Sequence, residues 1–139
     1  MSQPGIRIFL DRSIGTKSIA AALRSLALDV ETIKDRYGEE ASTVADVRWI
    51  EEATADGRVL ISADQRIRYN PLERRAICRH AARCFTFPRG SLTAAEMIGR
   101  LETHVEEIAR LAQQPGPYVY HLTEHRVVRM KLDCDDIIE

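Results

Sequence analysis

The sequence contains little of what marks membrane, secreted or metal-cluster proteins. In its 139 residues no apolar run approaches the roughly 20 residues of a membrane helix, so we expect no membrane contact. The opening residues, Met-Ser-Gln-Pro-Gly, lack the basic segment and apolar core of a signal peptide. The cysteines (Cys78, Cys84 and Cys134) form no C-x-x-C pair, and no cluster of His and Cys ligands is present. We therefore expect reduced, structural cysteines and a cytoplasmic protein.

A strong charge of one sign is also lacking, because the net charge is only −1. Bulk charge therefore does not predict nucleic-acid binding, but its distribution is uneven. Seven arginines and only one acid, Glu73, lie between Gln65 and Gly90, whereas residues 29–56 and the tail 133–139 are acidic. Such asymmetry is typical of a polyanion-binding face. A solvated helix surface rich in arginine explains the same pattern, and both interpretations stay open at this point.

Apolar periodicity predicts alternating strands and helices. The expected strands are 6–11, 29–33, 58–63 and 84–87, the expected helices are 15–26, 43–55, 71–82 and 93–112, and 34–42 reads as a polar loop. Alternation of this kind predicts an α/β fold in three layers, with a central, mostly parallel four-stranded sheet flanked by helices. The alternating segments 118–122 and 127–132 predict a C-terminal β-hairpin. We expect one domain over residues 1–139, with its core at about 6–113.

Two helix starts carry capping signals. Asn70 precedes Pro71 and Glu73, which suits a helix cap, a first helical position and a returning hydrogen bond. Thr93 and Glu96 have the spacing of a capping box. We therefore interpret Asn70 first as a cap and only second as an auxiliary residue of a functional site.

Acidic residues follow two strands that we expect to be neighbours. Right-handed crossovers place the first strand beside the third, with the second and fourth outside them. Asp11 and Asp64 then both lie in the crevice at the carboxyl ends of the strands, where open α/β sheets bind ligands. Asp46 opens a helix whose stripe of Trp49, Ile50 and Ala53 is buried, so its carboxylate should lean toward the core. Complementing the helix dipole is the other reading of Asp46.

Three carboxylates without a cluster of His and Cys ligands suit Mg²⁺ or Mn²⁺. Such a site activates water and stabilises charge on a phosphodiester. Three arginines that lie beside the acids, Arg12, Arg66 and Arg68, are candidates for gripping phosphate oxygens.

Four segments resemble a PIN-like domain. They are "FLDRSIG", "DVRWI", "LISADQRIRYNPLERR" and "FPRGSLTAAEM", and the resemblance covers residues 6–113. The most specific parts are 66–75 and 89–93. The similarity is greatest to the short PIN-like branch that includes the VapC-type toxins of toxin–antitoxin systems.

This resemblance implies a metal-dependent endoribonuclease that hydrolyses RNA phosphodiester bonds with metal-activated water. It implies that Asp11, Asp46 and Asp64 are the catalytic residues and the ligands of Mg²⁺ or Mn²⁺. It also implies a toxin, with RNA as substrate, a cognate antitoxin protein as partner, and a homodimer.

The phosphate-binding candidates beside these acids are Arg12, Arg66, Arg68 and Arg89. Many PIN domains carry a fourth acid after a later strand, but the corresponding turn, 88–91, contains none. Ser91 is the auxiliary candidate at this turn, and Glu51 and Glu40 are candidate substitutes for the missing acid. Asn70 is a further auxiliary candidate. Tyr69 we expect to be buried rather than stacked on a base.

Two other functions are also compatible with the sequence. The missing fourth acid permits a catalytically weakened PIN-like module that binds RNA or a partner. A phosphoacceptor receiver-like domain also carries acids after strands one and three. That class requires a second acid before the first and a lysine after the last strand, where this chain has Leu10 and Arg89.

Overall fold

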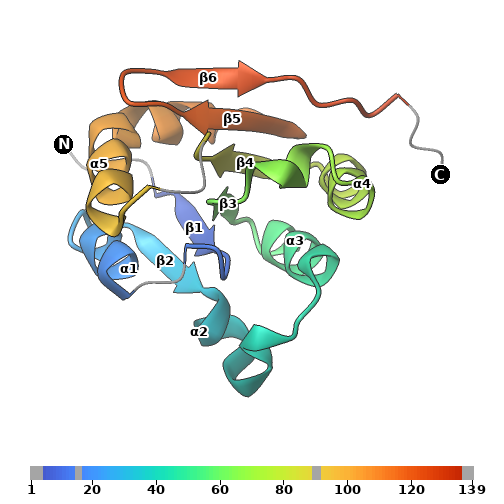
Figure 1. Cartoon of the computed structure of the whole chain (residues 1–139), viewed down its shortest axis with the longest axis horizontal. Coiled ribbons are helices and arrows are strands. Elements are labelled where there is room, and N and C mark those ends of the chain that lie inside the picture. Colours follow the sequence, from blue (N-terminus) through green and yellow to red (C-terminus); the bar gives the residue numbers. More distant parts are fainter. Residues whose placement is uncertain (1–4, 15–16, 89–91, 136–139) are drawn as a thin grey trace.

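The fold is that of a computed structural model, which describes residues 5–14, 17–88 and 92–135. Helices and strands alternate along the first part of the chain, and a hairpin closes it (Figure 1). The strands are β1 (Arg7–Leu10), β2 (Asp29–Thr32), β3 (Val59–Ser62), β4 (Arg83–Thr86), β5 (Tyr118–Leu122) and β6 (Val127–Met130). The helices are α1 (Lys17–Arg24), α2 (Ile33–Tyr37), α3 (Asp46–Ala55), α4 (Pro71–His80) and α5 (Ala94–Leu111), with 3₁₀ turns η1 (Gly38–Ser42) and η2 (Gln65–Arg68).

The strands form one sheet in the order β2-β1-β3-β4-β5-β6. The predicted arrangement of the first four strands is confirmed, with β1 beside β3 and with β2 and β4 outside them. The predicted terminal hairpin is also present, but it extends the same sheet. β5 pairs in parallel with β4, and only β6 is antiparallel. The mostly parallel sheet flanked by helices confirms the predicted three-layer α/β class.

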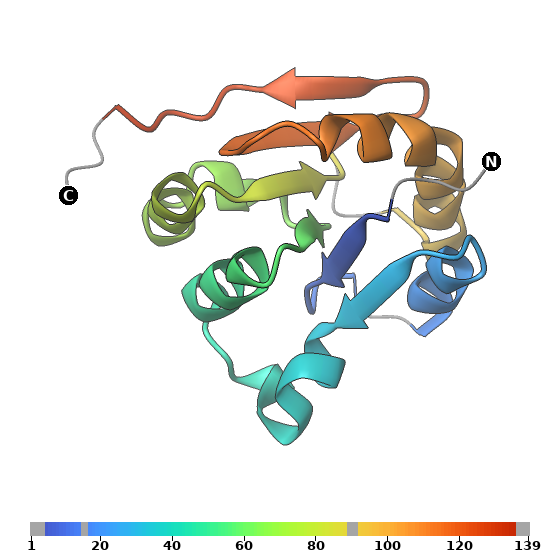
Figure 2. The same ribbon diagram turned by 180° about the vertical axis from the view of Figure 1, so that it is seen from behind.

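Helices cover both faces of the sheet, with α1 and α5 on one side and α3 and α4 on the other (Figures 1 and 2). Successive strand residues point to opposite faces, so β1 divides its side chains between two cores. Ile8 and Leu10 enter the core under α1 and α5, whereas Phe9 enters the core under α3 and α4. There Phe9 stacks on the fully buried Trp49, with ring centroids 5.4 Å apart. Residues just beyond Leu10 therefore stand at a sheet edge that both helix layers flank.

Local hydrogen bonds explain where two helices begin. The predicted capping box of Thr93 and Glu96 is present at α5. A second box, Thr32 with Asp35, starts α2, so part of the expected loop 34–42 is helical. Asn70 occupies the N-cap position of α4, but its side chain makes no capping bond there.

The expectation of three reduced cysteines is wrong. Cys78 of α4 and Cys134 form a disulfide, whereas Cys84 is free and buried. Their Cα atoms are 5.7 Å apart although 56 residues separate them in sequence, because the segment after β6 returns to α4. The cysteines therefore give no support to the predicted cytoplasmic location. Within the residues that the structure describes, no helix is long and apolar enough to cross a bilayer.

Candidate functional site

Asp11 is the most deeply buried acid of the candidate site, with 6% of its surface exposed. It follows β1 and accepts hydrogen bonds from the Ser13 backbone N–H at 3.0 Å and from the Ser13 hydroxyl. Its second oxygen accepts a 2.7 Å bond from the Ser62 hydroxyl. Burial raises the pKa of the Asp11 carboxyl to about 6, against the lowering by these bonds, and the charge of Asp46 raises it further.

Asp11 has no ion pair with any lysine or arginine in the described ranges 5–14, 17–88 and 92–135. A buried carboxylate without a compensating charge is unfavourable in its ionised form. A bound cation would remove that penalty. The neighbourhood of Asp11 therefore fits a cation better than it fits an isolated side chain.

Two serines connect the ends of β1 and β3 around Asp11. The Ser13 hydroxyl accepts a bond from the Ala63 N–H at 2.8 Å, and the Ser62 hydroxyl accepts one from the Asp64 N–H at 3.0 Å. Their oxygens are 3.2 Å apart. Sequence reasoning missed both serines, although each stands two residues from a candidate acid, after Asp11 and before Asp64.

Asp46 lies in the first turn of α3, as predicted, but it is not an isolated carboxylate. One of its oxygens accepts hydrogen bonds from the Trp49 indole N–H at 2.9 Å and from Arg12 at 3.0 Å. A buried indole N–H requires an acceptor, so Asp46 also stabilises the core. Arg12 donates further to the carbonyls of Ala41 and Val44. The guanidinium of Arg12 therefore connects the loop after β1 to the start of α3.

Asp64 caps η2 and is paired with Arg66. Its carboxylate accepts bonds from the Arg66 backbone N–H at 3.0 Å and from two guanidinium nitrogens at 2.9 and 3.1 Å. These bonds hold the pKa of Asp64 below its usual value. The Arg66 side chain, predicted to bind phosphate, therefore lies on an acid of the candidate site.

The structure brings the three predicted acids to one edge of the sheet without joining them. Ser62 connects Asp11 to Asp64 through hydrogen bonds, and the charge of Asp46 raises the pKa of Asp11. In the described part of the chain, no three His, Cys, Asp or Glu side chains are placed to hold one metal ion. Mg²⁺ commonly uses one or two carboxylates together with waters and substrate phosphates. The chemistry of the oxygen donors here, carboxylates without a cluster of His and Cys, fits that ion.

The remaining predicted residues lie in different places. The exposed Glu51 is 4.0 Å from His80 of α4 and does not join the acids. Arg68 donates to the Lys131 carbonyl at 3.3 Å and lies over the ring of Tyr69. Tyr69 is 52% exposed, so the expectation that it is buried is wrong. Asn70 has no capping role for its side chain, and Arg89 and Ser91 lie outside the described residues.

A hollow of about 580 Å³ adjoins Asp11 between α1 and the start of α2. Its floor includes the apolar side chains of Leu10, Ile14, Ala20 and Ile33, and its cations are Arg12, Lys17, Arg24 and Lys34. Arg24 is bound to Asp35 at 2.9 Å. The ammonium groups of Lys17 and Lys34 have no hydrogen-bond or ion-pair partner among residues that the structure describes. They are therefore available to an anionic ligand.

Buried polar side chains form a row across four adjacent strands. Asp11 follows β1, Ser62 and Thr86 end β3 and β4, and His121 is the last residue but one of β5. Strand alternation places these side chains on the face that α3 and α4 cover. Nε2 of His121 is buried without a hydrogen-bond partner among the described residues. Burial and the charge of Arg68 lower the pKa of His121, which favours the neutral imidazole. Its isolated position in sequence gave no signal of this row.

The fold, with the acids gathered at one edge of its sheet, is that of a PIN-like domain, and the sequence comparison agrees. A family profile described as a PIN like domain matches residues 6–89. The chain therefore belongs to the PIN-like family. It is 34% identical over 124 residues to a Mycobacterium tuberculosis protein described as a candidate ribonuclease, VapC45. The match covers 88% of this chain and 90% of that protein. No solved structure matches the chain.

Proposed function

We propose that the protein is a metal-dependent endoribonuclease and the toxin of a toxin–antitoxin pair. The observation that carries this proposal is the buried Asp11 carboxylate, which has no cationic partner among the described residues, at the sheet edge of a PIN-like domain. Its relative of similar length, described as a candidate ribonuclease, supports RNA as the substrate. The homodimer remains an expectation from the family resemblance, and the cytoplasmic location remains an expectation from the sequence alone.

The three acids have distinct parts in this proposal. Asp11 would hold Mg²⁺ or Mn²⁺, and Asp46 and Asp64 would add oxygen ligands. When bound, the ion supplies charge stabilisation for the phosphodiester and lowers the pKa of a water molecule. Ser13 and Ser62 keep the Asp11 carboxylate in one orientation, because each hydroxyl donates to one of its oxygens.

The arginines would change partners when substrate binds. Arg12 and Arg66 neutralise Asp46 and Asp64 in the free protein. RNA phosphates accept bidentate bonds from a guanidinium as carboxylates do, so in this proposal they compete with the acids for both arginines. The carboxylates would then be free for the metal ion. Arg89 is proposed as a further phosphate ligand, Ser91 and Asn70 as auxiliary residues, and Lys17 and Lys34 as contacts along the RNA backbone.

The test compares cleavage of a labelled single-stranded RNA in Mn²⁺, in Mg²⁺ and in EDTA. Asp11→Asn and Asp64→Asn should abolish cleavage, and both should relieve the growth arrest that we expect on expression of the native chain. Glu102→Gln, an exposed acid of α5, is the matched control and should cleave normally. Undiminished cleavage by both site variants would overturn the proposed site.

The antitoxin remains a proposed partner. A small neighbouring gene for a DNA-binding protein should neutralise the toxin when both are expressed. Copurification of the two proteins as a complex would support this assignment. Neutralisation that fails, with the toxin still active, would refute it.

A catalytically weakened RNA-binding module is the second candidate. The ion pairs of Arg12 and Arg66 favour it, because they occupy two of the three acids in the free protein. This candidate predicts RNA binding without cleavage at millimolar Mn²⁺. The family match leaves the phosphoacceptor alternative without support.

A further inference from the structure

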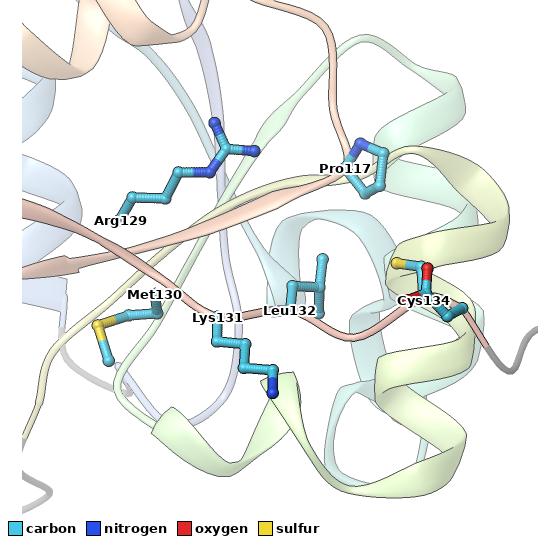
Figure 3. A pocket seen from close by; sticks show the side chains of 7 residues that line it. Pro117, Arg129, Met130, Lys131, Leu132 and Cys134 are labelled. Atoms are coloured by element: carbon cyan, nitrogen blue, oxygen red, sulfur yellow. The ribbon is translucent and has the colours of Figure 1, made fainter.

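The C-terminal segment after β6, Lys131–Asp135, lies along η2 and α4, and bonds between described residues attach it there. Arg68 of η2 donates to the Lys131 carbonyl at 3.3 Å, and Arg74 of α4 donates to the Asp133 carbonyl. The disulfide from Cys78 to Cys134 attaches the segment covalently. Figure 3 shows Cys134 beside α4, with Lys131 and Leu132 on the segment that leads to it.

The attached arginines continue the cationic edge of the candidate site. Arg68 stands four residues after Asp64, and Arg74 lies one helical turn into α4. Carbonyl oxygens of the segment now occupy donors that suit phosphate oxygens. Asp133 and Asp135 also place two acidic side chains on this surface, which would repel an RNA strand.

Two buried nitrogen atoms near the segment lack hydrogen-bond partners among the described residues. Nε of Arg68 is buried without a partner in the described ranges, as is Nε2 of the nearby His121. Buried polar atoms are normally paired, so a ligand with more acceptor oxygens than one carbonyl would suit Arg68 better. The exposed Tyr69 ring beside Arg68 offers a face for an unpaired base.

The segment is also incompletely packed. A hollow of about 570 Å³ runs along it, lined by Pro117, Arg129, Met130, Lys131, Leu132, Cys134 and Asp135 (Figure 3). Leu132 packs against the core under α3 and α4, and two hydrogen bonds to carbonyls add little against chain entropy. The disulfide is the covalent attachment of the segment to α4.

We propose that Arg68 and Arg74 form a second RNA-phosphate-binding surface, which the C-terminal segment covers while Cys78 and Cys134 are joined. Opening the disulfide releases the segment and lets an RNA strand extend from the acids onto this surface. The inference rests on the proposed function, because it takes RNA as the ligand. It adds a binding surface and a redox control that the acids alone do not provide.

The chemistry is thiol–disulfide exchange with a low-molecular-weight dithiol. One reductant thiolate attacks a sulfur of the Cys78–Cys134 bond and forms a mixed disulfide, and the other protein sulfur leaves as a thiolate. The second reductant thiol then displaces the protein, so the reductant becomes a disulfide and the protein gains two thiols. Closure is the reverse reaction with a small disulfide, which takes two electrons and two protons from the cysteines.

The experiment measures RNA binding by the Asp11→Asn full-length protein in EDTA, where no cleavage is expected. Fluorescence anisotropy of a labelled single-stranded RNA is compared after oxidised or reduced dithiothreitol, with free thiols counted by mass. Reduction should tighten binding severalfold and should steepen the slope of log affinity against log salt. Two released phosphate contacts predict a steepening of about 1.4, from ~0.7 per contact.

Variants separate the surface from the disulfide. Cys78→Ser with Cys134→Ser should bind as the reduced protein does and should not respond to reductant. Truncation after Met130, the end of β6, removes both carbonyls together with Cys134 and should give the same result, and it leaves Cys78 unchanged. Arg68→Ala with Arg74→Ala should remove the gain on reduction, whereas Arg110→Ala on α5 should not. Circular dichroism of the same samples establishes that they are folded.

Equal affinity and equal salt slope in the two redox states would overturn the inference, as would a gain that survives the double arginine substitution. Absence of RNA binding in both states would also overturn it. Failure of the proposed function gives a different pattern. In that case native protein cleaves no RNA in Mn²⁺, while the redox response of binding persists.

Discussion

The Ser62 hydroxyl donates a 2.7 Å hydrogen bond to the Asp11 carboxylate, and so connects the end of β3 to the acid after β1. The same hydroxyl accepts from the Asp64 N–H. One side chain therefore fixes two candidate acids. Because Ser62 contacts both acids, its substitution tests the geometry of the candidate site as directly as substitution of either acid.

Ser62→Ala should reduce both stability and cleavage. The substitution removes a bond to a buried carboxylate and leaves the Asp64 N–H without its acceptor, which should cost about 1–3 kcal/mol. Urea unfolding measures the loss. The control is Ser25→Ala, because the Ser25 hydroxyl donates to a carbonyl at the exposed end of α1. This control should lose less unfolding free energy. Equal losses in the two variants would contradict the role of Ser62.

Asp11 should make the metal-free protein more stable at low pH. Its pKa is about 6 in the folded chain against 3.8 for the unfolded reference, so the folded state binds more protons between these values. The stabilisation by the protonated carboxyl is complete below about pH 4 and is lost as pH rises through 6. The upper limit is about 3 kcal/mol, from ~1.4 kcal/mol per pKa unit.

Urea unfolding of the native chain and of Asp11→Asn in EDTA measures this dependence. The difference in unfolding free energy between the two proteins should change between pH 4 and pH 7. A constant difference would show that Asp11 does not titrate in this window. Added Mn²⁺ should bind more weakly below pH 6, because the ion must displace the proton.

Asp46 should separate stability from catalysis. Asp46→Ala leaves the Trp49 indole N–H buried without an acceptor and should cost about 1–3 kcal/mol of stability. Asp46→Asn keeps an acceptor oxygen for the indole but loses the charge, so it should remain stable and fail to cleave RNA. Trp49 is the single tryptophan of the chain, and its fluorescence reports the unfolding. Equal stability of the Ala and Asn variants would refute the structural role.

The strand order and the shared edge of Asp11 and Asp64 were predictable, because right-handed crossovers leave few arrangements for alternating strands and helices. The partners of Arg12 and Arg66 were not, since they depend on side-chain conformations at close range. The Cys78–Cys134 pair depends on the path of the chain after β6, which no local pattern describes. The helical turn α2 was missed although Thr32 and Asp35 have capping-box spacing, with Asp in place of the usual Glu.

The disulfide should contribute substantially to stability. It closes a loop over a sequence separation of 56 residues, for which the chain-entropy model gives about 4 kcal/mol as an upper value. Cys78→Ser with Cys134→Ser should therefore lower the urea midpoint, and reduction of the native chain should do the same.

Burial raises the pKa of the Cys84 thiol, so Cys84 should resist alkylation in the folded protein. Alkylation of Cys84 in the native state would contradict its burial.

Arg66→Ala should change metal binding and RNA binding in opposite directions. The guanidinium holds both oxygens of Asp64 in the free protein, so its removal should tighten Mn²⁺ binding measured without RNA. Loss of one phosphate contact should weaken RNA binding and reduce the salt slope by ~0.7. Arg110→Ala, which breaks an exposed pair with Glu107 on α5, is the control for charge alone. Weaker binding of both ligands by Arg66→Ala would show that Arg66 positions Asp64 for the metal, and the proposed change of partners would then be wrong.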